Sequence, residues 1–281
     1  MTASSYHDLP LLKGPVWTWE VPVYFFTGGA AGAAAVLAAA AQLTRAGDDV
    51  VRDARWIAAA GAAVSGPLLV ADLGRPDRFL YMLRVFKLQS PMSVGAWTVA
   101  VFGALTTTSV SADLVSRRTA CPVKIVGDVS GILAGITGLV MATYTGVLLG
   151  ATAIPVWKSH VRMLPVHFGA SSLGSAVSLL ELRGHRLPAL NGLALGAAVF
   201  ETLTGAAIEG RRDPESEPLR HGGTGRLTRL GGTLSGPVPL VLRLLGARKA
   251  AAASTLIGSL ITRFAWVEAG KVSANDVGVA L

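Results

Sequence analysis

Long runs without charged side chains dominate the chain. Residues 21–43, 88–112 and 129–157 contain no Asp, Glu, Lys or Arg. Each run is longer than the roughly 20 apolar residues that an α-helix needs to cross the hydrocarbon core of a bilayer. The runs are rich in Ala, Gly and Leu, and they lack the alternation of apolar and polar residues found in the strands of membrane β-barrels. The pattern therefore predicts membrane-spanning helices.

Applied to the whole chain, the same criterion predicts an all-α, polytopic membrane bundle of about eight helices in one membrane domain. Polar or helix-breaking residues interrupt the later spans: Glu201 the sixth, Pro237 and Pro239 the seventh, and Arg263 the eighth. A charged loop rich in Pro and Gly is expected over 209–229. The predicted spans are 21–43, 55–73, 89–113, 128–154, 164–182, 187–208, 230–246 and 250–268.

Composition points to the same class of protein. Of the 281 residues, 51% are apolar and 15% are charged, whereas a typical soluble domain has about 25% charged residues. The net charge of +8 comes from Lys and Arg that lie between the apolar runs, where basic loops orient helices and meet lipid head groups. We therefore expect a multi-pass protein of the cell membrane, with membrane lipid and not nucleic acid as a partner.

The rare residue types argue against several redox centres. An iron–sulfur cluster held by this chain would need about four thiolates, and Cys121 is the only cysteine. A haem between helices would need histidine ligands deep in the spans, and no histidine lies at the middle of a predicted span. We therefore expect no haem, no iron–sulfur cluster and no metal site in this chain. The histidines are His7, His160, His167, His185 and His221.

Side chains that can ionise or bind a ligand gather at one predicted face of the bundle. In an up-and-down chain, odd-numbered spans begin and even-numbered spans end at this face, and ionisable groups near lipid are often functional. Glu201 lies about seven residues before its span ends, roughly 10 Å inside the face. At the opposite face, Arg55, Asp128 and Glu181 are expected as ordinary boundary charges. The candidates of the first face are Trp17, Glu20, Asp72, Arg75, Tyr144 and His167.

Most of these candidates also fit an ordinary structural role. Glu20 and Arg75 fit interfacial charges with snorkelling stems, and Trp17 fits an aromatic anchor at the membrane interface. Tyr144 fits core packing, and His167 fits a helix cap or an interfacial side chain.

Asp72 has the most distinctive surroundings, because it is an acid at the end of a span, and Gly74, Arg75 and Pro76 follow within four residues. This arrangement indicates an ion pair with Arg75. A quinone site would need an apolar slot, donors for the two carbonyl oxygens and a group that exchanges protons. Ion or solute transport would use similar intramembrane acids, so these residues alone leave both functions open.

Four stretches resemble one known family, that of NrfD and PsrC, the membrane subunits of polysulfide reductase. Residues 17–32, WTWEVPVYFFTGGAAG, resemble its first helix. Residues 70–97 carry the blocks D-L-G-R-P-x-R-F and S-P-M-S-V-G-x-W. Residues 144–171, YTGVLLGATAIPVWKSHVRMLPVHFGAS, and the later stretch TRFAWVEAGKVSA are also similar to the family. The similarity covers most of the chain.

The resemblance implies an eight-helix membrane anchor that binds menaquinone or ubiquinone between its first helices, near the face that docks its partner. The implied partner is a ferredoxin-like iron–sulfur subunit, which connects to a molybdopterin or multihaem catalytic subunit. Glu20 and Asp72 would exchange protons with the quinone. Some relatives carry a histidine in the first helix, where this chain has none. The other implied quinone contacts are Trp17, Tyr24, Arg75, Tyr144 and His167.

Two rival hypotheses remain beside this one. A proton or solute transporter would show flux through membranes that contain this chain alone. A purely structural anchor, whose quinone site has decayed, would tolerate substitution of all the polar candidates.

Overall fold

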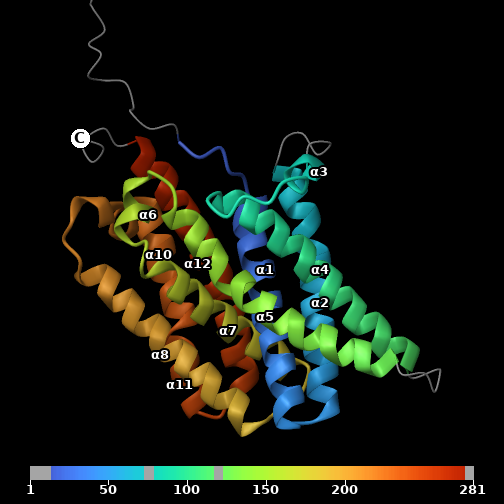
Figure 1. Cartoon of the computed structure of the whole chain (residues 1–281). Coiled ribbons are helices and arrows are strands. Elements are labelled where there is room, and N and C mark those ends of the chain that lie inside the picture. Colours follow the sequence, from blue (N-terminus) through green and yellow to red (C-terminus); the bar gives the residue numbers. More distant parts are fainter. Residues whose placement is uncertain (1–13, 73–78, 117–122, 276–281) are drawn as a thin grey trace, which may run out of the picture.

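The computed structural model describes residues 14–72, 79–116 and 123–275, and these residues form helices without any strand. The predicted all-α bundle is thereby confirmed (Figure 1). In chain order the elements are α1 (Glu20–Thr44), α2 (Asp48–Asp72), α3 (Phe79–Met82), α4 (Pro91–Ser116), α5 (Val123–Gly150), α6 (Pro155–Ser159), α7 (Leu164–Leu182), α8 (Pro188–Gly210), η3 (Pro214–Ser216), α9 (Glu217–Arg220), α10 (Gly222–Ser235), α11 (Pro237–Leu244) and α12 (Arg248–Asn275).

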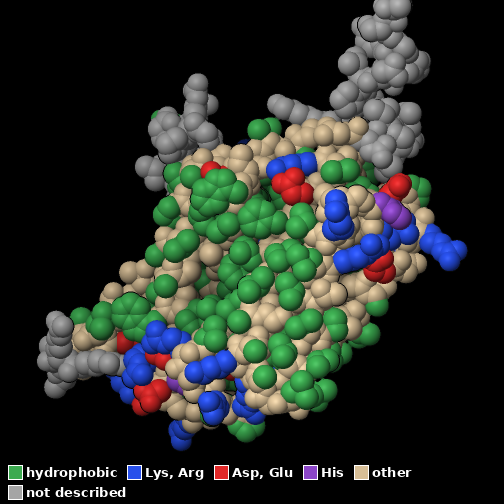
Figure 2. Space-filling model, turned by 180° about the vertical axis from the view of Figure 1, so that it is seen from behind, with side chains coloured by type: hydrophobic (Ala, Val, Ile, Leu, Met, Phe, Trp, Pro, Cys, Tyr) green, Lys and Arg blue, Asp and Glu red, His purple; other side chains and the backbone are tan. Residues whose placement is uncertain are grey.

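Six of the described helices are long and apolar enough to cross a membrane: α1, α2, α4, α5, α8 and α12. Large apolar side chains stay exposed on their outer faces, as a lipid-facing surface requires. Figure 2 shows a broad apolar surface on one side of the molecule, with the charged side chains gathered toward its two ends. The chain is therefore an integral membrane protein.

Two further helical segments bring the total close to the predicted eight. Helix α7 has the predicted bounds, 164–182, and packs against α1, α5, α8 and α12. Because these neighbours shield it, α7 can carry buried serines such as Ser175 and Ser178, whose hydroxyls donate to carbonyl oxygens one turn earlier.

The seventh predicted span is two helices, α10 and α11, which meet at Gly236. Pro237 and Pro239 follow directly and lack the N–H groups that would continue one helix. The charged loop predicted over 209–229 is shorter than expected, because α10 already begins at Gly222. This helix fits closely on α12, where a Cβ at Gly231 would stand 2.6 Å from the hydroxyl of Thr262.

Helix α1 lies at the centre of the bundle and contacts α2, α5, α7 and α12. Its close approach to α5 depends on Gly32 and Gly138, since a Cβ on Gly32 would overlap the carbonyl oxygen of Gly138. Small residues at such crossings allow tight packing between helices in lipid. We call the end of the bundle that carries α3 and α6, uppermost in Figure 1, the upper end, and the opposite end the lower end.

Arg55 at the lower end is buried, and the expectation that it is an ordinary boundary charge is wrong. Its guanidinium nitrogens donate to Asp113 at 2.7 Å, to Asp128 at 3.0 Å and to Gln42 at 2.7 Å. The absence of a side chain at Gly131 leaves room for the guanidinium. This one arginine thereby joins α1, α2, α4 and α5.

Glu181 is also buried at the lower end, and the same expectation is wrong for it. Both carboxylate oxygens accept hydrogen bonds from Arg243, at 2.8 and 2.6 Å. Arg243 also donates to the side-chain oxygen of Asn191 at 3.1 Å. The pair connects α7, α8 and α11, and a buried charge is tolerated in this way only when it is matched and hydrogen-bonded.

Candidate functional site

A cavity near the upper end is formed by α1, α2, α3, α4 and α5, and we call it the Tyr24 cavity. Its walls are mostly apolar, and three protonatable side chains from separate helices interrupt them: Tyr24, Asp72 and Tyr144. Small-molecule sites commonly have this composition, a largely apolar lining with a few placed polar groups. The lining residues are Trp17, Val21, Tyr24, Phe25, Leu69, Asp72, Met82, Met92, Gly95, Ala96, Tyr144 and Leu148.

Two carboxyl groups lie together at the edge of this cavity. Asp72 is the last residue of α2, and Glu20 is the first residue of α1. The charge of Glu20 acts on Asp72, and the backbone of Thr18 hydrogen-bonds to it. The hydroxyl of Thr18 in turn donates to Glu20. The two carboxyl groups are therefore close enough for their charges to interact.

The two tyrosines differ in their hydrogen bonding. The hydroxyl of Tyr144 donates to the carbonyl oxygen of Pro91, where α4 begins. This contact needs a glycine at position 95, because a Cβ there would stand within 2.6 Å of the Tyr144 ring. The Tyr24 hydroxyl has no hydrogen-bond partner among the described residues, although its ring is buried. Tyr24 is therefore free to donate to a molecule in the cavity.

Trp17 forms one wall of the cavity, and Trp157, which does not line the cavity, packs against it. Its indole stacks on that of Trp157, with ring centroids 5.2 Å apart and planes inclined by 18°. The Trp157 nitrogen donates to the carbonyl oxygen of Trp266 at 2.8 Å. Gly270 on α12 leaves room for the Trp157 ring, since a Cβ at that position would overlap it.

Replacing Gly270 by alanine is expected to destabilise the protein by about 1–3 kcal/mol, because the overpacked Trp157 must move and lose its stacking on Trp17. Thermal unfolding in detergent measures the change. Gly192→Ala on α8 is the control, because its Cβ would meet nothing within 4 Å and should stabilise the helix slightly. Equal melting temperatures for the two variants would contradict this account.

The structure brings together most of the predicted site residues, but not all of them. Trp17, Tyr24, Asp72 and Tyr144 line the Tyr24 cavity, and Glu20 lies beside it. Arg75 lies outside the described residues, so its pairing with Asp72 stays a prediction. His167 is not among the residues that line this cavity.

The structure also adds cavity residues that sequence reasoning did not single out. Met92, Gly95 and Ala96 line the cavity from the first turns of α4. All three belong to the block SPMSVGAW, which lies at the upper end like the chosen residues. Its position at the start of a span was the signal that could have identified them.

His167 belongs instead to a second polar cluster among α7, α8, α10 and α12. Its Nδ1 lies 3.5 Å from Oε1 of Glu201, and its ring contacts those of Phe168 and Trp266. Arg263 of α12 stacks over the ring of Phe168, with 3.7 Å from guanidinium carbon to ring centroid. All three ionisable side chains, His167, Glu201 and Arg263, are buried.

An all-helical membrane bundle with a protonatable, mostly apolar cavity near one end defines a polytopic membrane protein with a candidate small-molecule site. The family model described as "Polysulphide reductase, NrfD" matches residues 10–184, which is more than half of the chain. The chain belongs to the NrfD family of membrane subunits. The matched range includes every residue that lines the Tyr24 cavity. A search among curated proteins finds no match.

Proposed function

We propose that this NrfD-family membrane anchor binds menaquinone or ubiquinone in the Tyr24 cavity and exchanges electrons between the quinone pool of the cell membrane and an iron–sulfur partner. That partner would be a ferredoxin-like subunit, connected in turn to a molybdopterin or multihaem catalytic subunit. The observation that carries the proposal is the meeting of Tyr24, Tyr144 and Asp72 inside apolar walls.

The chemistry of the lining suits a quinone head group. A quinone ring is a flat apolar body with two carbonyl oxygens, so it favours apolar contacts on its faces and donors at its edges. Val21, Leu69 and Leu148 offer such apolar contacts. The free hydroxyl of Tyr24 is a donor for one carbonyl oxygen, and a protonated Asp72 is a donor for the other.

Proton exchange is the part of the reaction that this chain would perform. Reduction of a quinone to a quinol takes up two electrons and two protons, and oxidation releases them again. Asp72 would pass its proton to a quinone oxygen and recover one through Glu20, the first residue of α1. The electrons would cross to or from a cluster in the partner subunit.

Filling the cavity tests the proposal. Ala96→Phe places a ring in the Tyr24 cavity and is expected to lower the affinity for a short-chain quinone at least about tenfold, because the ligand and the new ring compete for one space. Quinone binding to the full chain in lipid nanodiscs measures the effect. Ala104→Phe is the matched control, since Ala104 lies on the same helix but is exposed.

Equal quinone binding by the two variants would contradict the proposal. If proteoliposomes of the wild-type chain alone also showed ion or solute flux that Ala96→Phe blocked, the transport hypothesis would replace it.

A further inference from the structure

Two glutamates are almost completely buried in the second half of the chain, and their surroundings differ. Glu181 is 4% exposed, and Arg243 binds both of its carboxylate oxygens. Glu201 is 3% exposed and has no such partner. Its Oε2 accepts a hydrogen bond from Ser235 at 3.1 Å, and the hydroxyl of Ser171 also faces the carboxylate. Its Oε1 has no partner in good hydrogen-bond geometry among the described residues. Glu201 therefore lacks the bound arginine that neutralises the charge of Glu181.

The charged and titratable groups that face Glu201 come from two neighbouring helices. His167 of α7 is the nearest, at 3.5 Å. Arg263 of α12 acts on Glu201 through its charge, but its Nη2 donates to the carbonyl oxygen of Phe168 at 3.0 Å and to Ser172 at 3.3 Å. Among the described residues, no lysine or arginine nitrogen lies within 4.0 Å of the Glu201 carboxylate.

An ionised carboxylate without a cation in direct contact is costly in such a place. A proton on Glu201 removes the cost, because the neutral acid needs only ordinary hydrogen bonds. A proton also gives Oε1 the ability to donate to the neighbouring imidazole of His167. The geometry therefore favours an acid that holds a proton and shares it with His167 through a hydrogen bond.

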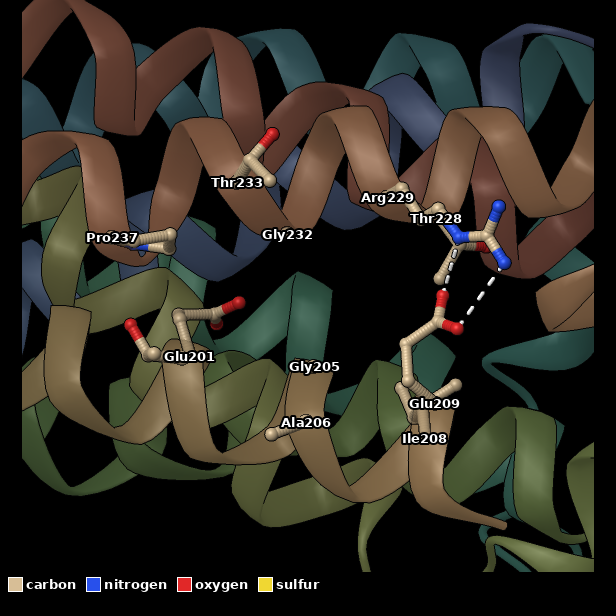
Figure 3. Close-up of a pocket in the computed structure, with 11 residues that line it drawn as sticks. Glu201, Gly205, Ala206, Ile208, Glu209, Thr228, Arg229, Gly232, Thr233 and Pro237 are labelled. Carbon is tan, nitrogen blue, oxygen red and sulfur yellow. Dashed lines mark hydrogen bonds and ion pairs between the residues drawn. The ribbon is translucent and has the colours of Figure 1, made fainter. Parts of the chain in front are cut away.

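A groove between α8 and α10 leads to this carboxyl group, and we call it the Glu201 groove. Figure 3 shows Glu201 toward one end of it and the ion pair of Glu209 and Arg229, with nitrogen–oxygen distances of 2.6 and 3.2 Å, at the other. Gly205 and Gly232 line it from the two helices, and a Cβ on either would meet nothing within 4 Å. The volume of the groove is about 160 Å³, and a single water needs only about 10–15 Å³.

We propose that Glu201 is a proton-exchange site, separate from the Tyr24 cavity, which takes a proton from the Glu201 groove and holds it in a hydrogen bond to His167. The proton leaves a hydronium ion and binds a carboxylate oxygen of Glu201, whose O–H group then donates to a ring nitrogen of the neutral His167 imidazole. The proposal is independent of quinone binding. Glu201, Ser235 and Arg263 all lie beyond the range matched by the family model.

Labelling with dicyclohexylcarbodiimide tests the proposal on the full chain in proteoliposomes. This apolar reagent enters membranes and reacts with protonated carboxyl groups, to which it adds covalently. Mass spectrometry of the peptides should find the label on Glu201 and not on Glu181, because Arg243 occupies both carboxylate oxygens of Glu181. Labelling should slow as the pH rises, by about tenfold per unit once the group ionises.

Three variants define the controls. Glu201→Gln keeps the size of the side chain and should abolish labelling of that peptide. Gly205→Leu should slow the labelling of Glu201 several-fold by filling the groove. Gly196→Leu is the matched control on the same helix, at a position that also has open space but does not line the groove.

The proposal is overturned if Glu201 stays unlabelled across the pH range in which the protein is folded, or if Glu181 is labelled equally fast. Labelling of Glu201 at the wild-type rate in Gly205→Leu would also overturn it, because the reagent would then not reach the carboxyl group through the groove. Protection by sodium chloride but not by potassium chloride would replace the proton with a sodium ion as the ligand.

Discussion

Replacing Asp72 by asparagine should lower the quinone-linked turnover of the assembled complex by about 10²- to 10⁴-fold, the usual contribution of a positioned acid or base. The amide keeps the size of the side chain but cannot carry a proton to or from the quinone. Quinone binding should change little, because the apolar walls and Tyr24 remain. Steady-state turnover with a soluble quinol analogue, compared with quinone binding to the same preparation, separates the two effects.

Glu268→Gln is the control for the general loss of an acid at the upper end of the bundle. Glu268 lies on α12, pairs with Lys271 at 2.7 Å and does not line the Tyr24 cavity. Its amide variant should retain wild-type turnover. Wild-type turnover in Asp72→Asn as well would remove Asp72 from the reaction and favour a purely structural anchor.

Loss of Arg55 should cost about 2–4 kcal/mol of stability. Removing one member of a buried ion pair typically costs about 3–5 kcal/mol, and the partial exposure of Asp113 and Asp128 reduces the penalty. In Arg55→Ala these two carboxylates and Gln42 lose their shared donor, and α1, α2, α4 and α5 lose a common contact. A lower melting temperature in detergent, with an unchanged helix content at low temperature, is the expected result.

Arg52→Ala provides the comparison, because Arg52 lies one turn earlier on α2 and is half-exposed. It pairs with the exposed Asp49 at 2.7 Å, and at 3.4 Å with Asp53, which keeps Arg183 and His185 as partners when Arg52 is removed. Surface pairs of this kind contribute about 0–1 kcal/mol, so its melting temperature should stay close to that of the wild type. A loss as large as that in Arg55→Ala would mean that net positive charge, and not the buried network, sets the stability.

Sequence could place the membrane helices because hydrophobic length is a property of a continuous segment. The charge-free runs became α1, α4 and α5, and α7 has the predicted bounds. The helix break at Gly236 follows equally local rules, because two prolines come after it. The extension of α12 to Asn275 was not predicted, since its last turns are held by contacts such as that of Gly270 with Trp157.

Depth along a helix was predictable, but rotation about its axis was not. Trp17, Tyr24, Asp72 and Tyr144 came together because they lie at similar depth and their helices turn those sides toward one space. His167 starts at the same end, yet α7 turns it toward Glu201 on α8. Nothing in one isolated helix reveals this angle.

Long-range pairing was the other limit. Glu181 and Arg243 are separated by 62 positions, and Glu181 alone looked like a boundary charge. Only the fold of α11 against α7 and α8 shows that each neutralises the other.

The two buried arginines with carboxylate partners, Arg55 and Arg243, both hold the lower end of the bundle. Local opening in a folded protein favours regions with fewer such constraints. We therefore expect the helices to separate more easily at the upper end, around the Tyr24 cavity, than at the lower end. A ligand that entered the Tyr24 cavity sideways from the bilayer would therefore leave both arginine networks intact.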